Sequence, residues 1–393
     1  MSATAGFESA APVWEVAPTA GMAAFDALAP EWLQLWKEHG DVGTPFVHPL
    51  WIRAHVAAME VARNLQLITA RRGGELRAVL PLIRDRGWYY GLPVRRLRSA
   101  AGVFGVRFDL CAAPGEAGRA AAAAIGHYLC QQRGWDVIEL RDAPAGAVAE
   151  ALIASAGAVR FPVGSWSSIR SPYLELDPEA HWERAIRSHY RYAMRRTRRH
   201  LQETGEPGGS GLRLVRAVWF DPAQLQAQLN DYYRLEAAGW KGRNGSDISS
   251  RPGARAFYDQ ACAAMAAAGC LVLHRLELDG RLVAMACGLS QGQSYYLLKW
   301  SYDEAYAKFG AGLLLAESML HECGEAGVRR FDFTGDHDPY KTRWTKTSLP
   351  HYWLYVFRPS AFGRCLLALK IRWAPRARRW LKRNAAEPRS EPL

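Results

Sequence analysis

The sequence predicts an α/β protein made of two consecutive domains of similar plan, each with a mixed sheet. Its 393 residues exceed what one ordinary hydrophobic core holds. Residues 65–82 and 271–289 both read as an apolar strand, a glycine turn and a second apolar strand. Residues 127–140 and 319–333 both read as a helix that ends at glycine and leads into a strand. An internal duplication accounts for both similarities, although unrelated α/β domains can share such patterns.

Two interruptions are visible, one between the units and one inside the second unit. Residues 161–178 contain three prolines and a glycine among serines, which is typical of a linker. The stretch 205–211 is rich in glycine and predicts a flexible loop inside the second unit. We therefore predict a first domain over residues 1–170, a second over residues 171–358 and a basic C-terminal segment over residues 359–393.

Composition narrows the classes of partner. With 49% hydrophobic and 22% charged residues the chain reads as folded, and its net charge of +12 favours an anionic cofactor, nucleic acid, glycan or membrane surface. The seven cysteines are scattered without CxxC spacing, which suggests neither a zinc site nor a disulfide framework. The N-terminus does not read as a secretion signal, and no apolar stretch approaches the roughly 20 residues that span a bilayer. We expect a protein of the reducing cytoplasm.

A short glycine loop in the second half predicts a phosphate site. Residues 294–300 read as a strand, and the residues after Gly312 have apolar side chains at helical spacing. Glycines allow the backbone to approach a ligand, and a helix N-terminus offers free N–H groups to a phosphate. The chain lacks the longer P-loop pattern and a GxGxxG opening a βαβ unit, which disfavours an NTPase or a dinucleotide site. The predicted cofactor-binding residues are Lys308, Phe309, Gly310, Ala311, Gly312 and Leu313.

These and other short motifs carry a family resemblance. They are Leu235-Glu236, the stretch 239–242, the hairpin 278–280, Lys299, the stretches 302–304 and 310–312, Tyr340-Lys341 and Trp344. On them, residues 189–344 resemble the GNAT domain of the CelD-type acetyltransferases, which are associated with bacterial cellulose and exopolysaccharide synthesis. If the first half is a degenerate copy, the whole chain resembles a tandem GNAT protein, as in the Fem-type aminoacyltransferases of peptidoglycan bridges.

The resemblance implies an acyl-CoA donor, with acetyl-CoA as the first choice, and direct attack by an amine. Loop amides would hold the pyrophosphate, and no metal is implied. Family loops usually open with arginine or glutamine where this chain has Ala307, so Lys308 would have to substitute for that contact. The first half has Gly102 and Gly105 but no helix directly after them, so we expect it to bind no CoA.

Two residues are candidates for acid and base chemistry. Asp221-Pro222 predicts the start of a helix whose apolar face includes Leu225 and continues to Glu236. A carboxylate on a buried face can have a raised pKa suited to a general base, but Glu236 can equally be an ionic partner for Lys241 or Arg243. Tyr340 lies where GNAT enzymes commonly place the acid that protonates the thiolate; a purely structural tyrosine is the alternative.

Further residues are predicted to contact the acceptor. They are Trp240, Lys241, Lys299 and Asp336. The cluster Asp336, His337 and Asp338 could suggest metal ligands, but so tight a group of aspartates beside glycine is more typical of a turn. We predict no metal site.

Two basic stretches add possibilities for binding. Residues 181–201 predict an amphipathic helix with an arginine face, either solvated or a track for tRNA, an acidic glycan or a phosphate. Residues 360–384 contain eight basic and no acidic residues among apolar ones, and either pack on the domain or lie on an anionic membrane. No nucleic-acid-binding fold accompanies them, so specific DNA binding is not expected.

Together these observations predict an N-acyltransferase that moves an acyl group from CoA to an amine. The acceptor would be a sugar or a cell-envelope or exopolysaccharide precursor, and the protein would be cytoplasmic, with peripheral membrane contact through its basic C-terminal segment. The alternatives are an aminoacyl-tRNA-dependent transferase of Fem type and a non-catalytic glycan-binding or scaffold module.

Overall fold

A computed structural model describes residues 13–38, 40, 43–102, 104–176, 188–205, 209–218, 220–245 and 247–373. The elements of the first half are β1 (Trp14–Ala20), α1 (Gly21–Lys37), η2 (Pro45–Val47), α2 (Pro49–Ala58), η3 (Ala62–Asn64), β2 (Leu65–Arg72), β3 (Glu75–Tyr89), β4 (Leu92–Ser99), β5 (Cys111–Ala112), α3 (Gly115–Gln131), β6 (Val137–Pro144), α4 (Ala149–Ala158) and β7 (Val163–Glu175).

The second half contributes helices on both faces of a second set of strands. Its elements are α5 (Ser188–Glu203), β8 (Leu212–Ala217), α6 (Pro222–Ala238), α7 (Trp240–Arg243), α8 (Ala254–Ala267), β9 (Leu271–Leu278), β10 (Arg281–Gln291), β11 (Ser294–Tyr302), η5 (Glu304–Phe309), α9 (Ala311–Glu325), β12 (Arg330–Asp332), β13 (Ser348–Phe357), α10 (Ala361–Leu367) and η6 (Ala368–Trp373).

The described strands form one mixed sheet in which the same order of elements occurs twice. In the first half β2, β3 and β4 form an antiparallel meander, and β6 returns parallel to β4 after α3. In the second half β9, β10 and β11 form the meander, and β12 returns parallel to β11 after α9. The predicted α/β class with a repeated mixed sheet is confirmed.

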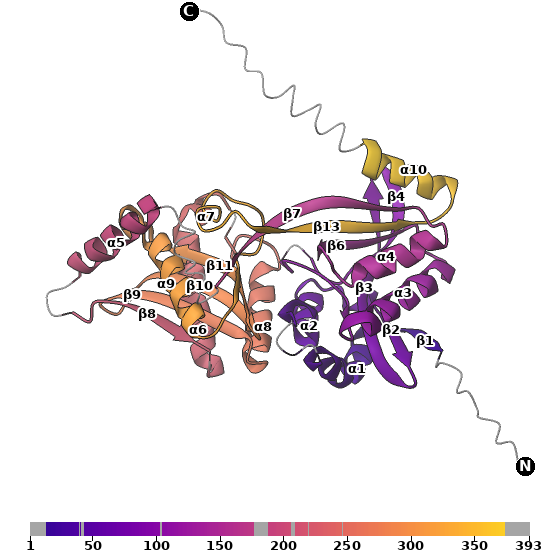
Figure 1. The fold of residues 1–393 in the computed structure, drawn as a ribbon, viewed down its shortest axis with the longest axis horizontal. Coiled ribbons are helices and arrows are strands. Elements are labelled where there is room, and N and C mark those ends of the chain that lie inside the picture. Colours follow the sequence, from indigo (N-terminus) through magenta and orange to yellow (C-terminus); the bar gives the residue numbers. More distant parts are fainter. Residues whose placement is uncertain are drawn as a thin grey trace, which may run out of the picture.

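Two long strands join the halves at the centre of the sheet (Figure 1). The last strand of the second half, β13, lies between β6 and β7 and is antiparallel to both. The end of β7 pairs with β12 through Tyr173–Glu175. The predicted boundary between residues 170 and 171 therefore falls inside a continuous strand, and β13, assigned from sequence to the second domain, completes the sheet of the first. The division into domains stays a prediction.

Aromatic and ionic contacts also connect the halves. Trp51 of α2 packs edge-on against Phe257 of α8 with ring centroids 5.1 Å apart. The Arg107 guanidinium donates to the fully buried Asp332 carboxylate over 2.6 Å, and Ser171 donates to the same carboxylate over 2.7 Å. Burial raises the pKa of Asp332, but Arg107 and these hydrogen bonds outweigh it and leave that pKa below its usual value.

A pocket at the start of helix α9

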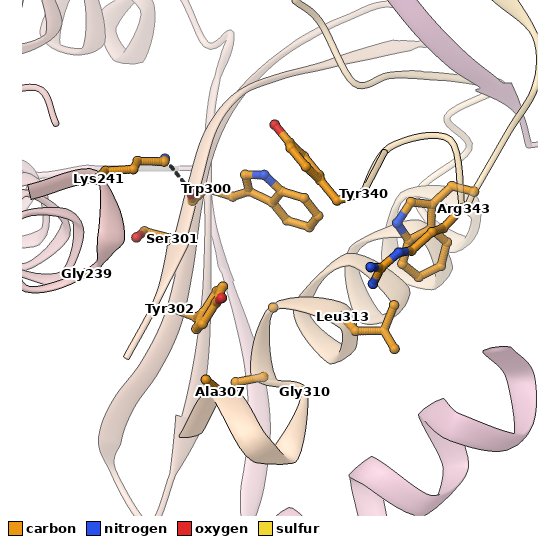
Figure 2. A pocket seen from close by; sticks show the side chains of 13 residues that line it. Gly239, Lys241, Trp300, Ser301, Tyr302, Ala307, Gly310, Leu313, Tyr340 and Arg343 are labelled. Atoms are coloured by element: carbon orange, nitrogen blue, oxygen red, sulfur yellow. Dashed lines mark hydrogen bonds between the residues drawn. The ribbon is translucent and has the colours of Figure 1, made fainter. Parts of the chain in front are cut away.

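A pocket of about 320 Å³ lies where β11 ends and α9 begins (Figure 2). This volume is at the lower end of the range for small-molecule sites. Its walls come from the end of α6, α7, the last residues of β11, the start of α9 and the loop after β12. The lining residues are Gly239, Lys241, Trp300, Ser301, Tyr302, Ala307, Gly310, Ala311, Gly312, Leu313, Tyr340, Arg343 and Trp344.

The pocket lies beside the part of β11 that does not pair with β12. Strand β11 pairs with β12 only from Ser294 to Tyr296. Beyond that point two of its carbonyls accept hydrogen bonds from side chains: Thr334 Oγ1 donates to the Leu297 oxygen, and Lys241 Nζ donates to the Trp300 oxygen over 2.9 Å. Side chains therefore take the place of a neighbouring strand at these two carbonyls, as expected for backbone acceptors that lack a strand partner.

The first turn of α9 presents free amides to this pocket. Gly310 has φ of +67°, a conformation that favours glycine, and its carbonyl accepts from the amides of Leu313 and Leu314. Among the described residues no acceptor meets the amides of Ala311 and Gly312, as expected for the first positions of a helix. These N–H groups and the helix dipole create positive potential suited to a phosphate.

Gly312 is required for packing as well as for access. A Cβ at this position would lie 2.8 Å from Cδ1 of Tyr302. The glycine therefore allows the helix to approach the ring of Tyr302, which itself lines the pocket.

Glu236 lies behind the pocket wall, not in it. Its fully buried carboxylate accepts from Lys241 Nζ over 2.7 Å and from the Ile248 amide over 2.9 Å. Tyr232 is a weaker third donor, with its hydroxyl 3.4 Å away. Of the two readings open from sequence, this geometry matches the ionic partner of Lys241, so any catalytic role of Glu236 must act through that lysine.

Tyr340 lies at the pocket with part of its ring exposed. Its ring centroid is 5.6 Å from that of Trp300. Burial, followed by the neighbouring charge and hydrogen bond of Asp338, raises the pKa of Tyr340 above its ordinary value. The phenol therefore stays protonated near neutral pH, with its proton donated to the Asp338 carboxylate.

The part of the chain that contains this pocket matches a known protein family. Residues 188–342 match the family described as acetyltransferase (GNAT) domain. This part of the chain is a GNAT domain. No curated protein matches the chain in sequence.

Solved structures extend the likeness over both halves. FemX shares 12% identity at a TM-score of 0.54, covering 91% of this chain and 99% of that chain. The C-terminal domain of a protein described as a lysylphosphatidylglycerol synthetase, from Agrobacterium fabrum, shares 10% identity at a TM-score of 0.53, covering 86% of this chain and 95% of that chain. At these identities the likeness concerns the fold, which is that of a GNAT-type N-acetyltransferase.

The GNAT domain brings together four of the six predicted loop residues. Gly310, Ala311, Gly312 and Leu313 line the pocket. Lys308 and Phe309 do not: Lys308 is exposed, with its ammonium 4.8 Å from the ring centroid of Phe309. Because the 3₁₀ turn η5 directs these two side chains away, Ala307 is the η5 residue that lines the pocket, and Lys308 does not substitute for the missing family side chain there.

The predicted acceptor-binding residues lie in different places. Lys241 lines the pocket of the GNAT domain, whereas the side chain of Trp240 lies outside the described part of the structure. Asp336 is exposed and accepts from the amides of Arg170 and His337, so it organises a turn and does not face the pocket.

Lys299 lies one residue before the pocket wall, with its ammonium 5.9 Å from the ring centroid of Tyr258. Burial lowers the pKa of Lys299 to about 8, with Glu236 opposing and Lys241 adding to the shift. An amine with this pKa exchanges protons near neutral pH.

Sequence reasoning missed several pocket residues. Tyr302 was included only in the motif 302–304, and Ser301 and Arg343 were not singled out. In Figure 2 the Arg343 guanidinium lies near Leu313 at the start of α9. The available signal was the nearby Tyr340-Lys341 and Trp344 motif of the family resemblance, but only the folded loop brings Arg343 to the helix.

The arginine-rich helix lies beside the glycine loop. A Cβ on Gly310 would be 3.1 Å from Oγ1 of Thr197 in α5. Arg198 pairs with Glu317 of α9 over 3.1 Å, while Arg195 is exposed. The side chains of Arg184, Arg187 and Arg191 of the predicted arginine face lie outside the described residues.

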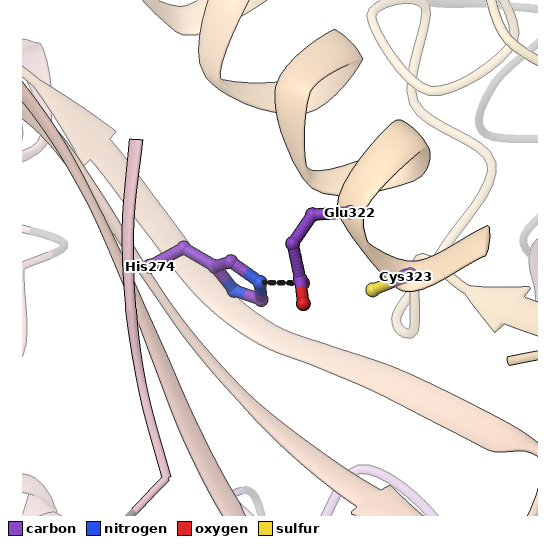
Figure 3. A group of neighbouring side chains, drawn as sticks. All are labelled: His274, Glu322 and Cys323. Atoms are coloured by element: carbon purple, nitrogen blue, oxygen red, sulfur yellow. Dashed lines mark hydrogen bonds and ion pairs between the residues drawn. The ribbon is translucent and has the colours of Figure 1, made fainter. Parts of the chain in front are cut away.

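One further group of the GNAT domain has metal-ligand chemistry (Figure 3). His274 Nε2 is 2.8 Å from Glu322, and Arg216 donates to the other oxygen of that carboxylate over 2.9 Å. Burial lowers the pKa of His274 against the opposing effect of Glu322, and burial raises the pKa of the Cys323 thiol. An ion-paired carboxylate and a protonated thiol account for this group without a bound ion.

Within the described residues no helix is both long and apolar enough to cross a membrane.

Proposed function

We propose that the GNAT domain transfers an acyl group, acetyl in the first instance, from coenzyme A to an amine. One observation carries the proposal: the pocket places two free amides at the start of α9 next to the unpaired edge of β11. The amides of Ala311 and Gly312 would bind the pyrophosphate, and the thioester arm would follow the edge from Tyr302 to Trp300.

The reaction needs two proton movements. The acceptor nitrogen attacks the thioester carbonyl carbon, the C–S bond breaks, the nitrogen loses a proton and the thiolate gains one. Tyr340, protonated and in the pocket, is the proposed donor to sulfur. Glu236 is the proposed base, acting through Lys241: the carboxylate takes a proton from the Lys241 ammonium, and the neutral Lys241 amine then takes the proton that the acceptor nitrogen loses.

The acceptor is proposed from the chemistry of the pocket and the family resemblance. Trp300, Tyr302, Tyr340 and Trp344 give the pocket aromatic walls, which suit the apolar face of a sugar ring. We propose an amino sugar or another cell-envelope or exopolysaccharide precursor, met on the cytoplasmic side of the membrane.

A second candidate donor is aminoacyl-tRNA. It is favoured by the position of the arginine-rich helix α5 beside Gly310, where RNA phosphates would meet the same amides. This candidate predicts tight binding of tRNA that weakens steeply with salt, together with little affinity for CoA. A non-catalytic glycan-binding or scaffold role would leave thioester turnover at background.

Isothermal titration with acetyl-CoA tests the proposal. Ala307 is exposed and lines the pocket, whereas Ala305 is exposed on the same turn and does not line it. We expect Ala307→Asp to weaken acetyl-CoA binding by about tenfold or more through charge repulsion, and Ala305→Asp to leave it unchanged. Absence of binding to the wild type, or equal affinity in both variants, would remove the pocket from the proposal.

A further inference from the structure

Four large aromatic side chains are exposed at one end of the first half. Trp88 and Tyr90, at the tip of the β3–β4 hairpin, are 71% and 53% exposed. Trp373 at the end of η6 is 65% exposed, and Phe362 in α10 is 36% exposed. Single exposed apolar side chains are common, but a group of this size at one end marks an interaction surface.

An aromatic cage fixes the C-terminal segment beside this hairpin. The Lys370 ammonium lies 4.9 Å from the ring centroid of Tyr89, 5.4 Å from Trp166, and 5.6 Å from both Trp353 and Tyr355. Cation–π attraction to several rings holds η6 against the end of β3 (Figure 1).

The same segment buries its aliphatic face. Leu366 is fully buried, and Leu367 and Ile371 pack against the same cluster. With this face and Lys370 held inward, Phe362 and Trp373 remain outside. Their exposure follows from how the segment is anchored.

A basic depression adjoins the aromatic side chains. It has a volume of about 480 Å³ and is lined by Arg95, Arg133 and Arg358 together with Asp136 and the N-cap of α10, Ser360. Asp136 pairs with Arg95 over 2.7 Å, and Arg133 has no carboxylate partner among the described residues. The depression therefore keeps an excess of positive charge.

The sequence beyond the described residues continues this charge. From residue 374 to residue 384 it contains five basic residues and no acidic one. Basic residues next to exposed tryptophan and tyrosine are the combination that binds the headgroup region of an anionic bilayer.

We propose that this aromatic–basic surface docks on an anionic lipid bilayer. Its members are Trp88, Tyr90, Phe362, Trp373, Arg95, Arg133 and Arg358. The four rings enter the headgroup region and Arg133 pairs with lipid phosphates, while Arg95 stays paired with Asp136 and Arg358 stays bound to the carbonyls of Trp135, Cys130 and Gln132. A bilayer fits better than a nucleic acid because the rings project from a hairpin tip and a helix surface and do not line a groove. The surface is separate from the pocket and does not depend on acyl transfer.

Sedimentation of the full chain with vesicles tests this surface. We expect binding to vesicles that contain phosphatidylglycerol, weak binding to pure phosphatidylcholine, and a loss of about tenfold or more in the double variant Trp88→Ala/Trp373→Ala. Arg133→Glu should weaken vesicle binding about tenfold, because it lowers the net charge of the surface by two units. The matched control is Tyr192→Ala on α5, which removes a side chain 68% exposed elsewhere.

The outcomes separate the proposal from its alternatives. Failure of the wild type to sediment with anionic vesicles, or an equal loss in the Tyr192 control, overturns it. Vesicle binding that tRNA displaces and that survives the double tryptophan variant assigns the positive charge to nucleic acid and also overturns it. Melting temperatures equal to that of the wild type confirm that the variants are folded.

Discussion

The two halves differ most in the connection that leads from the third strand of each meander to the following helix. In the first half, the described residues 100–102 and 104–114 between β4 and α3 fold back into the core, with Phe108, Leu110 and Cys111 each at most 2% exposed. In the second half, the shorter connection 303–310 stays at the surface and ends in a glycine at the mouth of the pocket.

The first connection also supplies its own anion to a helix start. The buried carboxylate of Asp109 accepts from the amides of Val148 and Ala149 over 2.8 and 2.9 Å, at the N-terminus of α4. Burial raises the pKa of Asp109 to about 6, although these hydrogen bonds oppose the shift. In the first half this carboxylate caps α4, whereas α3 and α9, the helices that follow the two connections, both start without a side-chain cap. The halves therefore differ in the connection and not in the helix start. Both halves have the same order of elements, but the described pocket lies beside the surface connection 303–310 of the second half.

The largest expected effect is a loss of stability at low pH. Burial lowers the pKa of His48 and His55 in the first half, and of His351 in β13, to about 4. Since the unfolded chain takes up protons below about pH 6.5 and the folded chain does not, stability falls as pH drops from about 6.5 toward 4. From pH 7 to pH 5, each histidine should lower the free energy of unfolding by roughly 2 kcal/mol. Over the same range the raised pKa of Asp109 should increase it by about 1 kcal/mol.

Denaturant unfolding at pH 7 and pH 5 measures this effect. His55→Phe keeps an aromatic ring next to Phe257 and removes one titrating group, so it should reduce the pH-dependent loss by roughly 2 kcal/mol. An unchanged pH dependence in this variant would show that His55 is not held neutral.

The second-largest effect is expected from a substitution that blocks the pocket at the start of α9. Ala307→Trp adds a large ring to the pocket lining beside the start of α9, so acetyl-CoA affinity should fall about a hundredfold in calorimetry. Ala305→Trp, on the same turn but outside the pocket lining, is the control and should bind as the wild type does. Retained affinity in Ala307→Trp would mean that the ligand binds elsewhere.

A smaller effect concerns Lys299, whose pKa is lowered to about 8 by burial. Because the unfolded chain binds a proton there up to about pH 10.5, stability should rise with pH between about 8 and 10.5. Lys299→Met removes this dependence and should raise the free energy of unfolding at pH 7 by on the order of 2 kcal/mol, with no gain near pH 10.5. Lys308→Met, at an exposed lysine, should change neither value.

The smallest effect is expected when position 307 receives the arginine that the family loop usually carries. Ala307→Arg should tighten acetyl-CoA binding about fivefold, which corresponds to about 1 kcal/mol for one added charge contact. Ala305→Arg adds the same charge outside the pocket lining and serves as the control. Equal gains in both variants would indicate general attraction instead of a specific contact.

Local chemistry made several elements predictable. Asp279 and Gly280 both adopt positive φ in the turn between β9 and β10, as their residue types predicted. Asp221 accepts from the amides at the start of α6, with Pro222 in its first turn. Gly310 caps α9 in the left-handed conformation. In each case the signal lies within a few residues of the structure that it specifies.

Other features depended on residues far apart in the chain. The apolar spacing predicted that Glu236 faces inward, but only the folded structure shows that Lys241 and the Ile248 amide occupy its oxygens. Arg107 and Asp332 are 225 positions apart, and no local pattern links them.

The sequence alone determined the class of fold, its repeat and the glycine loop, because periodicity and turn chemistry act over short distances. Tertiary structure decided that β13 crosses back between β6 and β7 and which side chains line the pocket. It also decided that Phe108 and Leu110 of the first connection are buried while the connection 303–310 stays at the surface. Strand pairing and side-chain burial are settled by contacts between distant segments, and these contacts exist only once the chain has folded.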